Sequence, residues 1–201
     1  MVREGIHYAL AAGAAGTALC ALVHPAAGIP LLAAALFCLY FFRDPERVIP
    51  AGPVAVSPAD GKVVEIRESG GGRRVSIFLN VFDVHVNRAP IGGRVTEVRY
   101  TPGKFRIASL EAASAENEQN AVTVDDGRSR VVFKQIAGLV ARRIVCTKKP
   151  GDAVERGERI GLIKFGSRVD VFLGPEWDLA VSRGQRVRAG SSILARRREG
   201  S

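Results

Sequence analysis

The chain has 201 residues, of which 47% are apolar and 24% are charged, so it is long and apolar enough to bury the core of an ordinary domain. This composition excludes a disordered chain. Lysine and arginine outnumber aspartate and glutamate by 29 to 20, and the net charge of +9 favours an anionic partner. Aromatic residues make up only 6%, and no recognition helix or aromatic RNA motif is evident. We therefore expect an acidic membrane, and no nucleic acid, as the partner.

The N-terminal region is almost free of charge and predicts a helical hairpin. Two apolar runs, Ile6–Val23 and Ile29–Phe42, are separated by HPAAGIP, whose prolines favour a turn. Arg3 precedes the hairpin, and Arg43 and Arg47 follow it, a pattern typical of a hairpin with both ends facing the cytoplasm. A full span needs about 20 apolar residues, so the hairpin either spans or enters the bilayer. A signal peptide and a buried hairpin of the soluble fold stay open as alternatives.

The remainder of the chain reads as short strands. After FFRDPER, runs of β-branched and apolar residues alternate with Gly, Pro and Asp. PGDAVERGERIGLI echoes SRGQRVRAGSSIL, and both resemble the turns of lipoyl and biotinyl carrier domains, although the lysine that carries those groups is missing. We predict a mostly β fold: a compact sandwich or barrel-like domain over residues 44–201 with lipoyl-carrier-like hairpins, preceded by a membrane-associated helical hairpin over residues 1–43.

Gly166 and Ser167 stand between two apolar runs in IKFGSRVDVFL, and this position indicates chemistry on the backbone. Glycine has no Cβ and can hold a strained peptide whose carbonyl lies within reach of the next hydroxyl. Attack by the Ser167 oxygen on the Gly166 carbonyl would give an ester, and β-elimination from it would cut the chain. Hydration and loss of ammonia would then leave a pyruvoyl group. From the dipeptide alone, a bend in a strand remains the alternative. A serine hydrolase would need a G-x-S-x-G elbow, which is missing.

Two further residues could assist this chemistry. Alternation in NVFDVHV places Asp83 and His85 on one face of a predicted strand, where His85 could transfer a proton near neutral pH. Taken alone, a histidine at a strand end is more often a hydrogen-bonded structural residue, and one histidine after residue 43 argues against a zinc or other metal site. Asp60 in SPADGKV could orient an acid or base or activate Ser167, or it could simply form a turn.

Five motifs in this order resemble the short form of the phosphatidylserine decarboxylase proenzymes: FFRDPER, SPADGKV, FLNVFDVHVNRAP, AENEQN and IKFGSRVDVFL. The resemblance covers nearly the whole chain and is strongest from Phe41 to Leu173. It implies self-cleavage between Gly166 and Ser167. The products would be a β chain of residues 1–166 and an α chain of residues 167–201 that begins with the pyruvoyl group.

The resemblance also implies the reaction. The pyruvoyl group from Ser167 is the cofactor, and it forms a Schiff base with the amine of a phosphatidylserine-type lipid, giving phosphatidylethanolamine and carbon dioxide. Asp60 and His85 match the positions that assist serine activation, and His85 is our candidate to protonate the substrate carbanion. Longer relatives carry a second histidine three positions further on, where this chain has Arg88, so the resemblance leaves the cleavage base open.

Partners and location follow from the same resemblance. We expect a homodimer of cleaved protomers at the cytoplasmic face of the cell membrane, acting on an ester-linked or ether-linked lipid. Glu116, Asn117 and Asn120 either line a head-group site or begin a solvated helix. Arg168 either contacts a phosphate or carboxylate or lies at the surface. The rival hypothesis is a membrane-anchored β-sandwich adaptor without catalytic activity.

Overall fold

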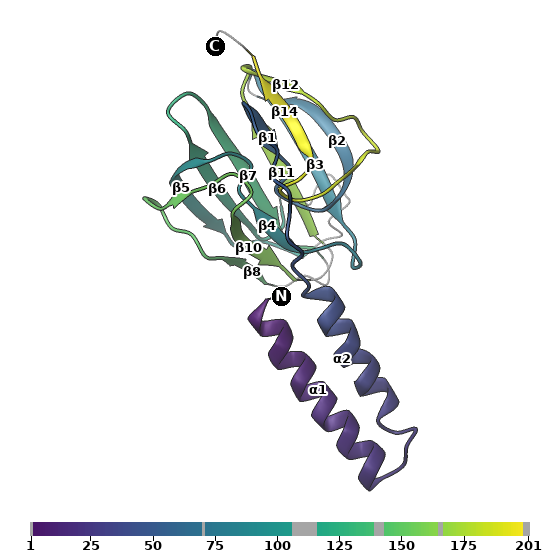
Figure 1. Ribbon diagram of the computed structural model, residues 1–201. Coiled ribbons are helices and arrows are strands. Elements are labelled where there is room, and N and C mark those ends of the chain that lie inside the picture. The colour runs from purple at the N-terminus through teal and green to yellow at the C-terminus, as the bar shows by residue number, and fades with distance from the viewer. Residues whose placement is uncertain (1, 70, 106–115, 139–142, 165–166, 199–201) are drawn as a thin grey trace. The chain divides into compact units, whose positions relative to one another are not determined.

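The computed structural model describes residues 2–69, 71–105, 116–138, 143–164 and 167–198. The chain divides into two compact units, residues 1–46 and 47–201. Figure 1 shows the first unit as two helices and the second as a set of strands. Both parts of the predicted fold class, a mostly β domain and an N-terminal helical hairpin, are confirmed.

The first unit is an antiparallel pair of helices, α1 (Arg3–Leu22) and α2 (Ile29–Phe41). Pro30 lies in the first turn of α2, where the missing N–H costs no helical hydrogen bond. A Cβ at Gly28 would collide with the carbonyl oxygen of Gly16, so glycine permits the close approach of the two helices. Much of the apolar surface of this hairpin is exposed.

The first helix also meets the length requirement of a membrane span. Residues Gly5–Leu22 are long and apolar enough to cross a bilayer, and 17% of this stretch is buried within the protein. At the open end of the hairpin, the Val2 N–H donates a hydrogen bond of 3.1 Å to the Phe42 carbonyl. The two ends of the hairpin are thereby tied together.

The second unit, the β unit, contains three antiparallel sheets. Their orders are β1-β14-β12, β4-β10-β8 and β13-β2-β3-β11-β7-β6-β5-β9. The strands are β1 (Val54–Val56), β2 (Gly61–Ser69), β3 (Gly72–Leu79), β4 (Val86–Arg88), β5 (Gly93–Thr101), β6 (Gln119–Asp125), β7 (Arg130–Ile136), β8 (Ile144–Cys146), β9 (Ala153–Val154), β10 (Arg159–Ile163), β11 (Ser167–Leu173), β12 (Trp177–Leu179), β13 (Arg186–Val187) and β14 (Ile193–Arg197).

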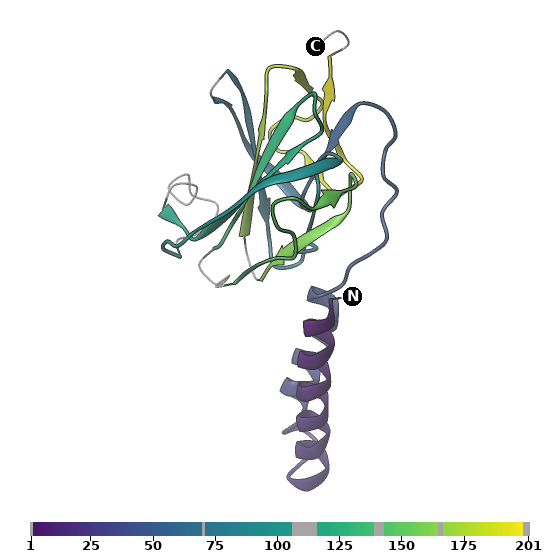
Figure 2. The same ribbon diagram turned by 90° about the vertical axis from the view of Figure 1, so that its left-hand side faces the viewer.

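The large sheet is curled, as Figures 1 and 2 show, and its inner face packs into an apolar core. Alternate residues of its central strands point inward, among them Ile77, Phe133 and Val171, and all three are fully buried. The two echoing segments noted in the sequence form β9–β10 and β13–β14. Their turns contain glycines with positive φ, including Gly157 and Gly190.

Strand β11 occupies the centre of the large sheet. It pairs with β3 from Ser167 opposite Leu79 to Leu173 opposite Arg73, and it pairs with β7 on its other edge. The strands that follow it also pair with earlier ones, because β14 pairs with β1 as well as with β12, and β13 pairs with β2. The C-terminal segment therefore shares its sheets with strands from the preceding part of the chain.

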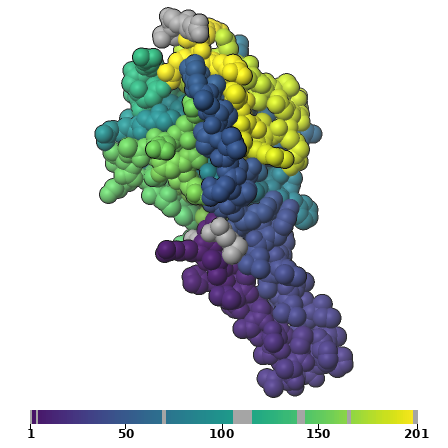
Figure 3. Space-filling view, viewed as in Figure 1, coloured from purple at the N-terminus to yellow at the C-terminus, as the bar shows by residue number. Residues whose placement is uncertain are grey.

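Residues 47–53, which we call the strap, run to β1 as an extended segment without helix or strand (Figure 2). Arg156 holds it by donating hydrogen bonds to the carbonyl oxygens of Pro50 (2.6 Å) and Gly52 (2.7 Å). Ile49 occupies the space that a side chain at Gly157 would need. In the space-filling view of Figure 3, the blue segment that contains the strap lies between the yellow C-terminal strands and the green strands.

Candidate active site

Ser167 begins the central strand of the large sheet and is completely buried. Its side chain shares the inward face with Val169 and Val171, because alternate residues of a strand point to the same side. Among the described residues, its Oγ has no hydrogen-bond partner. A buried hydroxyl without a partner is rare, so a special role is indicated. Gly166, the other half of the expected cleavage site, lies outside the described residues.

His85 lies at the end of a tightly bonded turn. The Asp83 carboxylate accepts a hydrogen bond from the Asn80 N–H (2.9 Å) and pairs with Arg186, while the Asn80 side chain accepts from the Phe82 N–H (2.8 Å). The expected continuous strand over NVFDVHV is therefore wrong for residues 80–85. Polar side chains close a turn there, and the extended strand β4 begins only at Val86.

The ring of His85 is almost fully buried, and its Nδ1 lies 2.9 Å from the Asp83 carbonyl oxygen. A carbonyl oxygen can only accept, so in this contact Nδ1 carries the hydrogen. In the neutral ring, Nε2 then holds the lone pair that a general base needs. The environment thus selects one tautomer of His85.

Backbone contacts bring His85 and Ser167 to the same end of the β unit. Leu79 is the partner of Ser167 on β3, and a short turn leads from it to His85. The His85 carbonyl then accepts the N–H of Ile163 (3.3 Å), which precedes Ser167 by four residues. Leu79 thus lies opposite Ser167, and His85 is bonded to Ile163, so the two chain segments are joined at both of their ends.

Asp60 lies on neighbouring backbone, but its carboxylate is engaged elsewhere. It follows a segment that runs alongside β4, where the Arg88 N–H donates to the Pro58 carbonyl (2.9 Å). Its two oxygens lie 3.0 and 2.9 Å from Arg47 Nη2, and one also accepts the Ala189 N–H (2.8 Å). Among the described residues, it therefore contacts the strap and the C-terminal segment rather than His85 or Ser167.

Arg88, which stands where longer relatives have a second histidine, makes a structural contact. Arg88 is 5% exposed, and its guanidinium donates to the Gly157 carbonyl oxygen (3.0 Å). This bond joins β4 to the turn before β10.

Arg168 is buried, so the surface position considered for it is wrong. It is 1% exposed and lies on the sheet face opposite to Ser167. Its Nε donates to Asp170 (2.6 Å), and its Nη2 donates to Ser76 Oγ (2.7 Å) and contacts Glu65 (3.2 Å). Arg168 thus fixes the strand immediately after Ser167.

A set of buried amides near the site was partly missed by the sequence interpretation. Asn117 and Asn120 are 1% and 3% exposed, so the expected solvated helix start is wrong at these residues. Asn120 bonds to Gln135, and Gln135 bonds to Asn87, two residues after His85. A glutamine inside the apolar run VVFKQIAG was the signal that could have revealed this set, because a buried amide needs partners.

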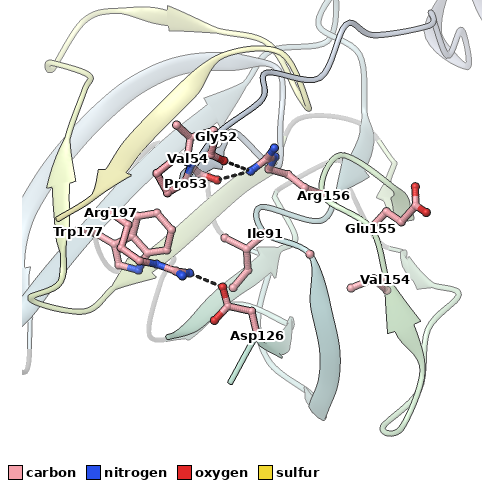
Figure 4. Close-up of a pocket in the computed structure, with 11 residues that line it drawn as sticks. Gly52, Pro53, Val54, Ile91, Asp126, Val154, Glu155, Arg156, Trp177 and Arg197 are labelled. Atoms are coloured by element: carbon pink, nitrogen blue, oxygen red, sulfur yellow. Dashed lines mark hydrogen bonds and ion pairs between the residues drawn. The ribbon is translucent and has the colours of Figure 1, made fainter. Parts of the chain in front are cut away.

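A cavity of about 510 Å³ lies at the other end of β11 (Figure 4). It is lined by Trp177, which follows the end of β11, and six residues of strand separate Leu173 from Ser167 by about 20 Å. Arg156 and Arg197 border it, and both are bonded to the protein itself, Arg156 to the strap and Arg197 to Asp126 and Ser129. The cavity is therefore separate from the candidate active site.

The Asp126–Arg197 pair at this cavity gives a pH-dependent prediction. Burial alone would raise the pKa of Asp126, but hydrogen bonds from Arg197 and from the N–H groups of Ser129 and Arg128 outweigh it and hold the pKa below its ordinary value. The stabilisation is present above the unfolded-state pKa of about 4 and is lost as pH falls through the lower folded value. We expect Asp126→Asn to lower the free energy of unfolding by up to about 1 kcal/mol at pH 7.

The measurement is urea unfolding of wild type and Asp126→Asn at several values between pH 7 and pH 3. The difference between the two proteins should shrink as the pH falls. A constant difference over this range would contradict the assigned ion pair.

Comparisons with known proteins identify the family. The family described as phosphatidylserine decarboxylase matches residues 34–195. A phosphatidylserine decarboxylase proenzyme of Solibacter usitatus (strain Ellin6076) is 64% identical over 197 residues, covering 98% of this chain and 97% of that protein. Proteins of the same name from Desulfotalea psychrophila (strain LSv54 / DSM 12343) and Syntrophus aciditrophicus (strain SB) are 49% and 47% identical, covering 81% and 96% of this chain and 80% and 96% of those proteins. The chain belongs to the phosphatidylserine decarboxylase family.

Proposed function

We propose that this protein is a self-processing, pyruvoyl-dependent decarboxylase that converts phosphatidylserine, or the ether-linked equivalent, to phosphatidylethanolamine and carbon dioxide. The observation that carries the proposal is the buried Ser167 hydroxyl, unpartnered among the described residues, at the first position of a central strand. The names of the relatives support both the substrate and the existence of a precursor.

Self-cleavage uses the chain's own groups. The Ser167 oxygen attacks the Gly166 carbonyl carbon, the C–N bond of that peptide breaks, and the nitrogen of residue 167 takes up the hydroxyl proton. Removal of the α-proton of residue 167 then expels the Gly166 carboxylate and leaves dehydroalanine. Addition of water and loss of ammonia give the pyruvoyl group. His85 is our candidate to assist proton removal, and Asp60, whose carboxylate bonds to Arg47 and the Ala189 N–H, is our candidate to orient this acid–base group through the neighbouring backbone.

The surroundings of residue 167 fit a pyruvoyl group. Strand β11 is bonded to β3 and β7 from its first residues onward, so a new chain end at residue 167 would keep its place after the cut. Ser167 and its β3 partner Leu79 are both buried. When formed, the group supplies a carbonyl that accepts the electron pair released by decarboxylation. Nε2 of His85, in its protonated form, is our candidate to deliver the proton to the product carbon.

The helical hairpin would hold the enzyme at its substrate. Its apolar surface and the basic residues beside it, Arg3 and Arg43, favour an anionic bilayer, at about 1 kcal/mol for each basic residue near the surface. We propose that the protein resides at the cytoplasmic face of the cell membrane. We also propose that the cleaved β and α chains remain together and that two such protomers form a homodimer.

The test is the intact mass of the purified protein under denaturing conditions. We expect two chains, residues 1–166 and 167–201, with the second blocked to Edman sequencing. The same preparation should release carbon dioxide from phosphatidylserine vesicles. A single uncut chain that releases no carbon dioxide would overturn the proposal and favour the adaptor without catalytic activity.

A further inference from the structure

Three buried amides form a directed chain across the interior of the β unit. Asn120 Nδ2 donates to Gln135 Oε1 (3.0 Å), Gln135 Nε2 donates to Asn87 Oδ1 (2.9 Å), and Asn87 Nδ2 donates to the Pro58 carbonyl (3.4 Å). Gln135 and Asn87 are fully buried, and Asn120 is 3% exposed. Each amide therefore relies on its neighbours for hydrogen bonds.

The orientation of the Gln135 amide follows from its other contact. Its Nε2 also lies 3.4 Å from the Val145 carbonyl oxygen, which can only accept a hydrogen bond. The nitrogen must then face both Val145 and Asn87. Gln135 lies on β7 of the large sheet. Its NH₂ group thus bonds to both β8 and β4 of the three-stranded sheet β4-β10-β8.

This cross-sheet bond lies beside both candidate catalytic residues. Gln135 is the β7 partner of Val169, two residues after Ser167 on the same inward face. Asn87 is two residues after His85 and therefore close to it along the chain. The bond between Gln135 and Asn87 joins the sheet that carries Ser167 to the strand that follows His85.

After self-cleavage, the bond between Gln135 and Asn87 would have a structural role that it does not have in the uncut precursor. In the uncut chain, β10 pairs with β4 at Leu162 and Val86 and continues through residues 164–166 into Ser167. The strand next to His85 is therefore covalently linked to Ser167 over a few residues. A cut between residues 166 and 167 breaks that link. Non-covalent contacts must then fix the distance between His85 and residue 167.

We propose that Gln135 is a positioning residue that holds His85 against residue 167 once the chain has been cut. The inference rests on the proposed self-processing. It predicts a split between the two reactions of this protein: self-cleavage, which occurs while the covalent link is intact, depends little on Gln135, whereas decarboxylation, which follows the cut, depends on it strongly.

The experiment compares wild type with Gln135→Met, which keeps the length of the side chain and removes the amide. Gln135→Asn, which keeps the amide but shortens the chain by one methylene, is a milder second variant. Val131→Ala is the matched control, because Val131 is fully buried on the same strand at the end remote from Ser167. All proteins are full-length and in detergent.

We expect Gln135→Met to cleave itself at nearly the wild-type rate and to yield an α chain blocked to Edman sequencing. Its kcat for decarboxylation should fall about tenfold or more, because the variant loses the bond to Asn87 together with those to Asn120 and Val145, with KM nearly unchanged. Gln135→Asn should show the same split with a smaller fall, and Val131→Ala should not show it.

A second measurement does not depend on activity. Hydrogen exchange of the Arg88 amide, which donates to Pro58, reports the order of β4. Gln135→Met should accelerate this exchange strongly in the cut protein and much less in a Ser167→Ala background, where we expect the chain to stay whole. Equal acceleration in both backgrounds, or equal loss of cleavage and decarboxylation, would overturn the inference alone. An uncut wild-type protein would overturn the proposed function and this inference with it.

Discussion

Replacing Ser167 by alanine is expected to leave one intact chain of 201 residues and to reduce decarboxylation to the background rate. The change removes the oxygen that attacks the preceding carbonyl, so neither the cut nor the pyruvoyl group can form. No ordinary side chain can take over as the electron acceptor. Mass spectrometry of the denatured protein and release of carbon dioxide from phosphatidylserine vesicles measure the two effects.

The stability of the Ser167→Ala protein provides a further check. Because the Ser167 hydroxyl is buried and unpartnered among the described residues, its removal should leave the free energy of unfolding of the precursor unchanged or slightly raised. Ser129→Ala is the control, since this serine is bonded to Arg197 at the remote cavity and should not affect cleavage. Cleavage of the Ser167→Ala chain at the same peptide would exclude the proposed role of Ser167.

The second large effect concerns the buried ion pair that follows Ser167. We expect Asp170→Ala to lower the free energy of unfolding of the uncut protein by about 3–5 kcal/mol, because it leaves the Arg168 guanidinium buried with one carboxylate fewer. Urea unfolding in the Ser167→Ala background, followed by the fluorescence of Trp177, the single tryptophan, measures the loss in the β unit.

An exposed pair serves as the matched control. Asp178 bonds to Arg198 at 2.7 Å, but their side chains are 58% and 51% exposed, so Asp178→Ala should lower the free energy of unfolding far less than Asp170→Ala. Asp170→Asn should lie between the two, because it keeps an acceptor for Arg168 Nε. Equal losses for Asp170→Ala and Asp178→Ala would mean that burial does not strengthen the inner pair.

The elements of the fold were predictable where local patterns decide them. Two apolar runs separated by prolines predicted α1 and α2, and glycine-punctuated apolar runs predicted a mostly β unit. The strand expected over Val81–Asp83 failed because Asn80 and Asp83 bond to nearby backbone and close a turn. Alternation alone does not reveal such competition between side chain and backbone.

The candidate site residues that lie within sequence motifs were predictable. The proximity of His85 and Ser167 follows from the order of the motifs and is supported by the backbone contacts. The partner of Asp60 was not predictable, because Arg47 precedes it by 13 residues and meets it only through the path of the strap. The bond between Gln135 and Asn87 spans 48 residues, and no local pattern specifies a pairing at that separation.

Strands β11, β13 and β14 of the C-terminal segment pair with strands from the earlier part of the chain, and this pairing affects the lifetime of the mature protein. If the chain is cut before Ser167, the resulting fragment supplies the middle of one sheet at β11 and of another at β14. Withdrawal of this fragment would separate β11 from β3 and β7, β14 from β1, and β13 from β2 at once, so dissociation requires global unfolding rather than local fraying. Exchange of fragments between molecules should therefore be as slow as unfolding itself. Each molecule would therefore retain the α chain with which it folded. A damaged chain in one molecule could not be replaced by the corresponding chain of another.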